Sequence, residues 1–172
     1  MKRTPYLLKL AVVICVIIVV LVPVSIFTIS QPLSVVVPEN WGEMEAQEVF
    51  VGINDYRKAN GLSEFVWDSE LESFALYRAT DMVDRDYFSH YDPQTGKVKL
   101  NELPHPMTIG ENLYQISGLA VRLMDDVDGN VLEGWKSSPA HNELMLFPLM
   151  HRAGVALART PTRIIVVLVT SE

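Results

Sequence analysis

Apolar residues recur at helical spacing after the proline-containing stretch at residues 31–40. Val49, Ile53 and Tyr56 fall on one face, and Gly61 follows them as a stop signal. The pattern predicts a helix from Glu45 to Asn60 whose apolar face packs against a core.

A second helix is predicted after Trp67, where two alternative N-terminal signals stand. Asp68 can cap the helix, or Ser69 and Glu72 can form a capping box. The apolar positions that then share one face are Leu71, Phe74, Ala75, Ala79 and Met82. This face predicts a second helix that covers the core.

Two strands are predicted at the end of the chain. The first spans residues 151–158, and the second spans residues 163–170. The Ile-Ile-Val-Val-Leu-Val run of the second is too continuous for a strand with one exposed face, so we expect it in the centre of a sheet. Helices followed by a terminal sheet predict a layered α+β domain.

Residues 124–130 are rich in acids, and two interpretations of them compete. Gly129 within Met-Asp-Asp-Val-Asp-Gly-Asn is typical of a calcium loop, but Met124 and Trp135 stand where that loop needs its first and last acids. We therefore expect a turn with an acidic rim.

A short helix is predicted to begin at Pro139. Ser138 offers a hydroxyl as N-cap, and proline suits the first helical position because its missing N–H would have no partner there. His141 then lies in the first turn, where the helix dipole disfavours protonation of an imidazole. A neutral histidine in that place can bind a metal or accept a hydrogen bond.

The N-terminal segment from residue 7 to 29 carries one charge, Lys9, and is long enough to span a bilayer. A cleaved signal peptide is the alternative, but signal peptides have shorter apolar regions. Basic residues cluster before the span, so the positive-inside rule predicts cytoplasmic residues 1–6, a transmembrane anchor at 7–29, a linker at 30–44 and an outer domain at 45–172. The membrane is thus the first expected partner, and the protein would be secreted if the segment is cleaved.

The outer domain is acidic and has no cysteine. Of the 14 lysines and arginines, three precede residue 30, which leaves 11 basic residues against 21 acidic ones and a formal charge of −10. This charge excludes nucleic acid as a natural partner. The one cysteine, Cys15, lies in the predicted span, so the domain must fold without a disulfide.

Three residues from distant segments could carry chemistry. His90 lies in the aromatic-rich segment 87–96, predicted to be a loop, Glu111 follows a short apolar stretch, and His141 lies in the predicted short helix. Two imidazoles and a carboxylate can hold zinc or another divalent metal with an open position, or can move protons. Each residue also has an ordinary structural explanation in packing, backbone hydrogen bonding or helix initiation.

The segments around these residues resemble, in order, the prokaryotic branch of the CAP superfamily, named after cysteine-rich secretory proteins, antigen 5 and pathogenesis-related 1 proteins. Its module is also called the SCP domain. The resemblance covers residues 45–169. The matching segments are Phe88-Ser89-His90, Gly110-Glu111-Asn112-Leu113, Ser138-Pro139-Ala140-His141-Asn142 after Trp135, and Ala153-Gly154-Val155-Ala156; Asn54, Arg57, Trp67, Arg78 and Asp81-Met82 also fit.

This resemblance implies an α-β-α sandwich with a small antiparallel sheet and a cleft. In the family, two histidines and two glutamates line the cleft and hold a divalent metal in some members. The matching residues here are His90, His141 and Glu111, while Ser138 takes the place of the second glutamate. The resemblance thus implies a triad, with Asn112 and Ser138 beside it.

The function expected from this resemblance is that of a membrane-anchored extracellular module that binds a lipid, a glycan or a peptide in its cleft. A metal-dependent hydrolase, either a peptidase or an esterase, is the alternative that uses the same residues. A purely structural spacer is a third possibility. The sequence leaves open whether the protein is an enzyme, because a cleft alone does not make one.

Overall fold

A computed structural model describes residues 41–103, 109–123 and 126–172 of the chain, with the side chains of residues 122 and 123 excepted. The predicted span at 7–29 lies outside these residues. Within the described ranges, no helix combines the length and the apolar character that crossing a membrane requires.

Helix α1 spans Trp41–Ala59, and helix α2 spans Ser69–Asp84. The first begins four residues before its predicted start, so the last part of the predicted linker is helical. Of the two signals proposed for the start of α2, Asp68 acts as the cap, because its side chain accepts from the amides of Glu70 and Leu71. Both predicted helices are confirmed.

The described residues form four strands, β1 (Val66–Trp67), β2 (Ile109–Ser117), β3 (Arg152–Thr160) and β4 (Arg163–Ser171), which make one sheet in the order β1-β3-β4-β2. Strand β4 pairs antiparallel with β3 and with β2, whereas β1 pairs parallel with β3. The three long strands thus form the small antiparallel sheet that was expected, and the short β1 adds a parallel pair to it. The prediction of a central last strand is confirmed, since residues 164–171 are all buried.

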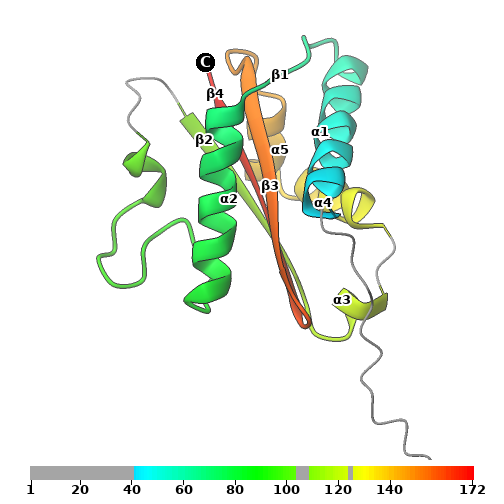
Figure 1. Ribbon diagram of the computed structural model, residues 1–172. Helices are drawn as coiled ribbons and strands as arrows, with labels where there is room; N and C mark the ends of the chain where they lie inside the picture. The colour runs from blue at the N-terminus through cyan, green and yellow to red at the C-terminus, as the bar shows by residue number, and fades with distance from the viewer. Residues whose placement is uncertain (1–40, 104–108, 124–125) are drawn as a thin grey trace, which may run out of the picture. The chain divides into compact units, whose positions relative to one another are not determined.

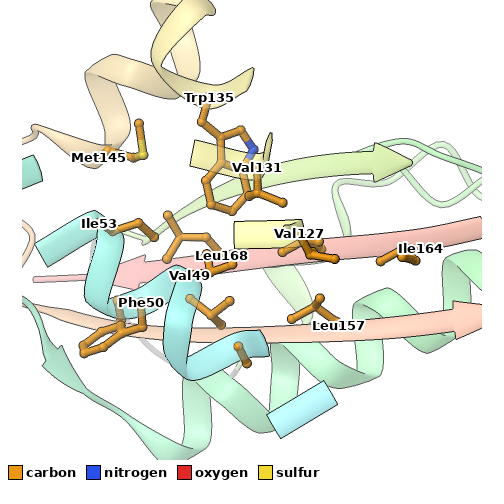
Figure 2. Close-up of a cluster of buried hydrophobic side chains, with 14 of the residues drawn as sticks. Val49, Phe50, Ile53, Val127, Val131, Trp135, Met145, Leu157, Ile164 and Leu168 are labelled. Carbon is orange, nitrogen blue, oxygen red and sulfur yellow. The ribbon is translucent and has the colours of Figure 1, made fainter. Parts of the chain in front are cut away.

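Helices cover both faces of the sheet (Figure 1). Ile164, Val166 and Leu168 of β4 face one core with α1, α4 (Val127–Ser137) and α5 (Pro139–Met145). Side chains from α1 and α4 meet Leu168 in this core (Figure 2). Ile165, Val167 and Val169 face the second core, which is formed with α2. The described domain is layered α+β, as the residue patterns predicted, and has the α-β-α arrangement that the family resemblance implied.

Strand β2 and helix α4 were not predicted. In β2, the consecutive Glu111 and Asn112 interrupt the alternation of apolar and polar residues, yet both are buried. In α4, the acid-rich segment is a helix start, since Asp126 is the N-cap and accepts from the amide of Gly129 at 2.8 Å. The expected turn with an acidic rim is therefore wrong from Asp126 onward. Two shorter elements, η1 (Lys99–Glu102) and α3 (Ala120–Leu123), complete the domain.

Candidate functional site

The site lies along β2, one of the two edge strands of the sheet. Successive residues of a strand point to opposite faces, so Glu111 and Asn112 serve different layers. Glu111 faces α2, where its carboxylate meets Arg78, and Asn112 faces α5, where its amide donates to the carbonyl of His141 at 2.9 Å. The edge strand thus connects the two helical layers at this point.

Both oxygens of the Glu111 carboxylate are engaged. Its Oε1 accepts from Nε of Arg78 at 2.8 Å, and its Oε2 lies 2.7 Å from Nδ1 of His90. The Glu111 side chain is 2 % exposed, the Arg78 side chain is 0 % exposed and the His90 side chain is 44 % exposed. The buried Arg78–Glu111 ion pair is therefore hydrogen-bonded to His90, whose side chain is partly exposed to solvent.

The contact with Glu111 decides which nitrogen of a neutral His90 carries the proton. An ionised carboxylate only accepts hydrogen bonds, so Nδ1 must be the donor. Nε2 is then left with a lone pair. The arrangement presents an oriented imidazole acceptor at the surface, held from behind by a carboxylate.

The loop that carries His90 is fixed by its backbone. The carbonyl of Ser89 accepts from Nη2 of Arg78 at 2.8 Å, and the carbonyl of His90 accepts from the amide of Lys99 at 3.0 Å. The Ser89 hydroxyl accepts from the amide of Tyr91. Ser89 therefore has the turn role of an ordinary loop serine.

His141 lies in the first turn of α5, which begins at Pro139 as predicted. Burial lowers the pKa of His141, and the proximity of His90 lowers it further. The lowered pKa agrees with the neutral His141 that was expected. Its causes are burial and the charge of His90, whereas the expectation rested on the helix dipole.

The far end of α5 is anchored by Arg57 of α1. The buried guanidinium donates to the carbonyl of Met145 at 2.7 Å and to that of Met150 at 3.2 Å, and it lies 3.7 Å from the ring centre of Phe65. Tyr56 adds a bond from its hydroxyl to Oδ1 of Asn142 at 3.0 Å. These contacts fix the helix that presents His141.

Four of the five predicted site residues are linked by direct contacts or by charge. His90 hydrogen-bonds to Glu111, and Asn112 donates to the carbonyl of His141. The charge of a protonated His90 lowers the pKa of His141. Ser138 lies at the junction of α4 and α5 as the N-cap by backbone conformation, but its hydroxyl makes no capping bond. The expected hydroxyl cap is thus wrong.

Glu111 is poorly placed to act as a metal ligand. Among the residues that the structure describes, one group of three or more possible ligands has all its ligand atoms within 4.8 Å of one another, and it consists of Glu45, Glu48 and Asp128, not of the triad. Both oxygens of Glu111 are already occupied by Arg78 and His90. Glu111 is therefore arranged to orient His90, as carboxylates do behind metal-bound histidines, rather than to bind a metal itself.

The role of Arg78 was missed at the sequence level. A signal was present, because Arg78 occupies a core-facing position in α2, in register with Leu71, Ala75 and Met82. A fully buried charge needs a partner, so an arginine on an apolar stripe predicts a buried acid. The sequence does not show which acid, since Glu111 is 33 residues away.

The sequence model described as the cysteine-rich secretory protein family, CAP, matches residues 52–170. No curated protein matches this chain.

Solved structures share the fold. An outer surface protein from Borrelia burgdorferi is 17 % identical, with a TM-score of 0.62 over 76 % of this chain and 93 % of that one. An extracellular protein containing an SCP domain from Bacillus anthracis is 22 % identical, with a TM-score of 0.56; the match covers 74 % of this chain and 41 % of that longer one. NaASP2, solved with Zn²⁺, is 16 % identical, with a TM-score of 0.55 over 77 % of this chain and 82 % of that one. At these identities the likeness shows the fold alone.

Proposed function

Because this chain belongs to the cysteine-rich secretory protein (CAP) family, as its motifs predicted, we propose that its domain binds a ligand through the paired imidazoles of His90 and His141. The observation that carries the proposal is the 2.7 Å contact between Nδ1 of His90 and Glu111, which leaves Nε2 as an oriented acceptor. His141, held neutral by burial, supplies the second acceptor. Two neutral imidazoles suit a divalent metal or a ligand rich in N–H and O–H donors.

Zinc is the metal that we propose for this pair. His90 and His141 would hold it, and Glu111 would stay behind His90 as the orienting carboxylate. The structure of NaASP2 with Zn²⁺ supports zinc binding by this fold without assigning residues here. Since two protein ligands leave open positions, the affinity should be modest, and a lipid, glycan or peptide group could complete the coordination.

A metal-dependent hydrolase is the second candidate, and the oriented His90–Glu111 pair is the observation that favours it. When bound, zinc would supply a Lewis acid for a peptide or ester carbonyl. His90 would be held in one tautomer by Glu111, and the half-exposed ring would keep access to solvent. Activity on a panel of peptides and esters separates this candidate from a binding module.

We also propose that the domain acts outside the cell, tethered by residues 7–29 through the linker at 30–44. The apolar length of the segment and the basic residues before it support this orientation. The names of the Borrelia outer surface protein and the Bacillus extracellular protein are consistent with such a location.

Zinc titration of the full-length protein in detergent, followed by calorimetry, tests the paired imidazoles. We expect His90→Ala and His141→Ala each to weaken zinc binding at least about tenfold, and Glu111→Gln to weaken it roughly ten- to a hundredfold. His151→Ala is the matched control, because His151 is exposed at the start of β3, outside the site. Zinc binding by the His90 and His141 variants that equals the control would refute the proposal.

A further inference from the structure

We propose that Arg78 is the positioning residue of the site: it sets the place of the Glu111 carboxylate and of the backbone before His90 at the same time. The inference rests on the proposed role of His90. Arg78 itself is 0 % exposed, so it touches no ligand and acts only through its two neighbours.

The guanidinium reaches both halves of the His90–Glu111 pair. Nε donates to Oε1 of Glu111 at 2.8 Å, while Nη2 donates to the carbonyl of Ser89 at 2.8 Å and lies 3.5 Å from Oε2 of Glu111. The first contact holds the partner of His90. The second holds the residue that precedes His90 in the chain.

A third contact ties the same guanidinium to the start of the His90 loop. Nη1 donates to the hydroxyl of Tyr87 at 2.8 Å, and that hydroxyl in turn donates to Asp81 of α2. Asp81 also pairs with Arg85 at 3.2 Å. The loop is therefore attached to α2 on both sides of Phe88, and His90 follows from a fixed backbone.

This set of contacts needs the shape of arginine. Three partners lie in different directions, and the planar guanidinium offers five N–H donors in fixed geometry. A lysine ammonium at the same position would keep the charge but could not reach Glu111, Tyr87 and Ser89 together. Charge balance and positioning can thus be separated by one conservative substitution.

Arg163 of β4, which pairs with Ser117 at the other end of β2, provides a matched control. Its Nε donates to Gln115 at 2.9 Å and its Nη2 donates to the carbonyl of Tyr87, so it also joins β2 to the loop. Its hydrogen bonds within the described part of the chain do not include Glu111 or His90. Substitution of Arg163 therefore shows how the His90 tautomer responds when the loop is loosened without any change in the contacts of Glu111.

Nitrogen NMR of the imidazole ring, on zinc-free full-length protein above the titration range of histidine, tests the inference. The wild type should show His90 protonated at Nδ1 alone. We expect Arg78→Lys to give a mixture of both tautomers and Arg163→Lys to keep the wild-type signal. A His90 that stays protonated at Nδ1 alone in folded Arg78→Lys would overturn the inference.

A second pair of variants covers the case in which Arg78→Lys does not fold. In Glu111→Gln, Arg78 should take the amide oxygen, so the amide N–H faces His90 and the proton moves to Nε2. In Arg78→Met with Glu111→Gln, both charges are removed and the amide is free to turn, so the tautomers should mix. Identical His90 spectra in the single and double variants would overturn the inference. These measurements use zinc-free protein. They therefore test the role of Arg78 even if the protein proves not to bind zinc.

Discussion

Two fully buried arginines lie on opposite faces of the sheet. Arg57, on the side of α1, donates to backbone carbonyls of Ser63 and of the end of α5 and the turn after it, whereas Arg78, on the side of α2, donates to a carboxylate. Burial lowers the pKa of Arg57. Burial acts in the same direction on Arg78, but the contacts with Glu111 and Tyr87 raise its pKa above the ordinary value.

This difference separates two uses of a buried cation. Arg57 supplies side-chain donors to the carbonyls of Met145 and Met150, so it stabilises the packing of the end of α5 and the following turn. A buried ion pair, by contrast, contributes little net stability, and its retention is better explained by the geometry that it imposes. We therefore assign Arg57 to the stability of the fold and Arg78 to the placement of His90.

The largest expected effect comes from Arg57→Met. The substitution leaves the carbonyls of Met145 and Met150 without their side-chain donor, at about 1–3 kcal/mol for each of these two buried groups, so we expect a loss of roughly 2–6 kcal/mol in free energy of unfolding. Urea unfolding measures it, with the exposed neighbour in Lys58→Met as control. The double variant Arg78→Met with Glu111→Gln should cost clearly less, because it removes both charges together. Equal losses would contradict the division between the two arginines.

Gly154→Ala has an intermediate expected effect and concerns the approach of α2 to the sheet. A Cβ at Gly154 would lie 2.0 Å from the amide nitrogen of Glu72, so the helix backbone must move. We expect a loss of about 1–3 kcal/mol in free energy of unfolding. Gly42→Ala in α1 is the control, since its nearest neighbour would be a carbonyl at 3.7 Å, and it should be neutral or stabilising by up to ~1 kcal/mol. Similar destabilisation by both variants would show that the close approach of α2 is unimportant.

The smallest expected effect is a pH dependence from His141. Its pKa in the folded protein lies below the ordinary value of 6.5, so above that pH it is neutral in both states. As the pH falls below 6.5, the unfolded chain binds a proton that the folded state disfavours, and stability decreases. Urea unfolding between about pH 7.5 and 5.5 should therefore show a shallower decline for His141→Asn than for wild type. The same slope in both, with His151→Asn as control, would mean that His141 does not contribute.

The elements that the sequence predicted are those with uninterrupted periodicity. Val49 and Ile53 mark α1, Leu71 and Met82 mark α2, and the apolar run of β4 marks a central strand. Strand β2 was not predicted because its buried residues include Glu111, and the burial of that carboxylate depends on Arg78 of α2. No local pattern contains that contact.

Helix α4 was not predicted from the sequence for a different reason. It contains two glycines, and one of them is required by tertiary packing, because a Cβ at Gly134 would lie 2.2 Å from the ring of Tyr114. Glycine lowers helix propensity, so the sequence alone argues against the helix that packing selects. The site residues were found through family motifs, while the orienting role of Glu111 required the geometry of its two oxygens.

The order of the strands in the sheet has a consequence for how the chain can be made. The two central strands, β3 and β4, are the last elements in the sequence, and β1 and β2 border them on either side. During synthesis, α1, α2 and β2 leave the ribosome before the surface on which they pack exists. The apolar faces of these elements must therefore wait for the C-terminal hairpin, and a chain that stops before residue 152 has no sheet on which to assemble the His90–Glu111 pair.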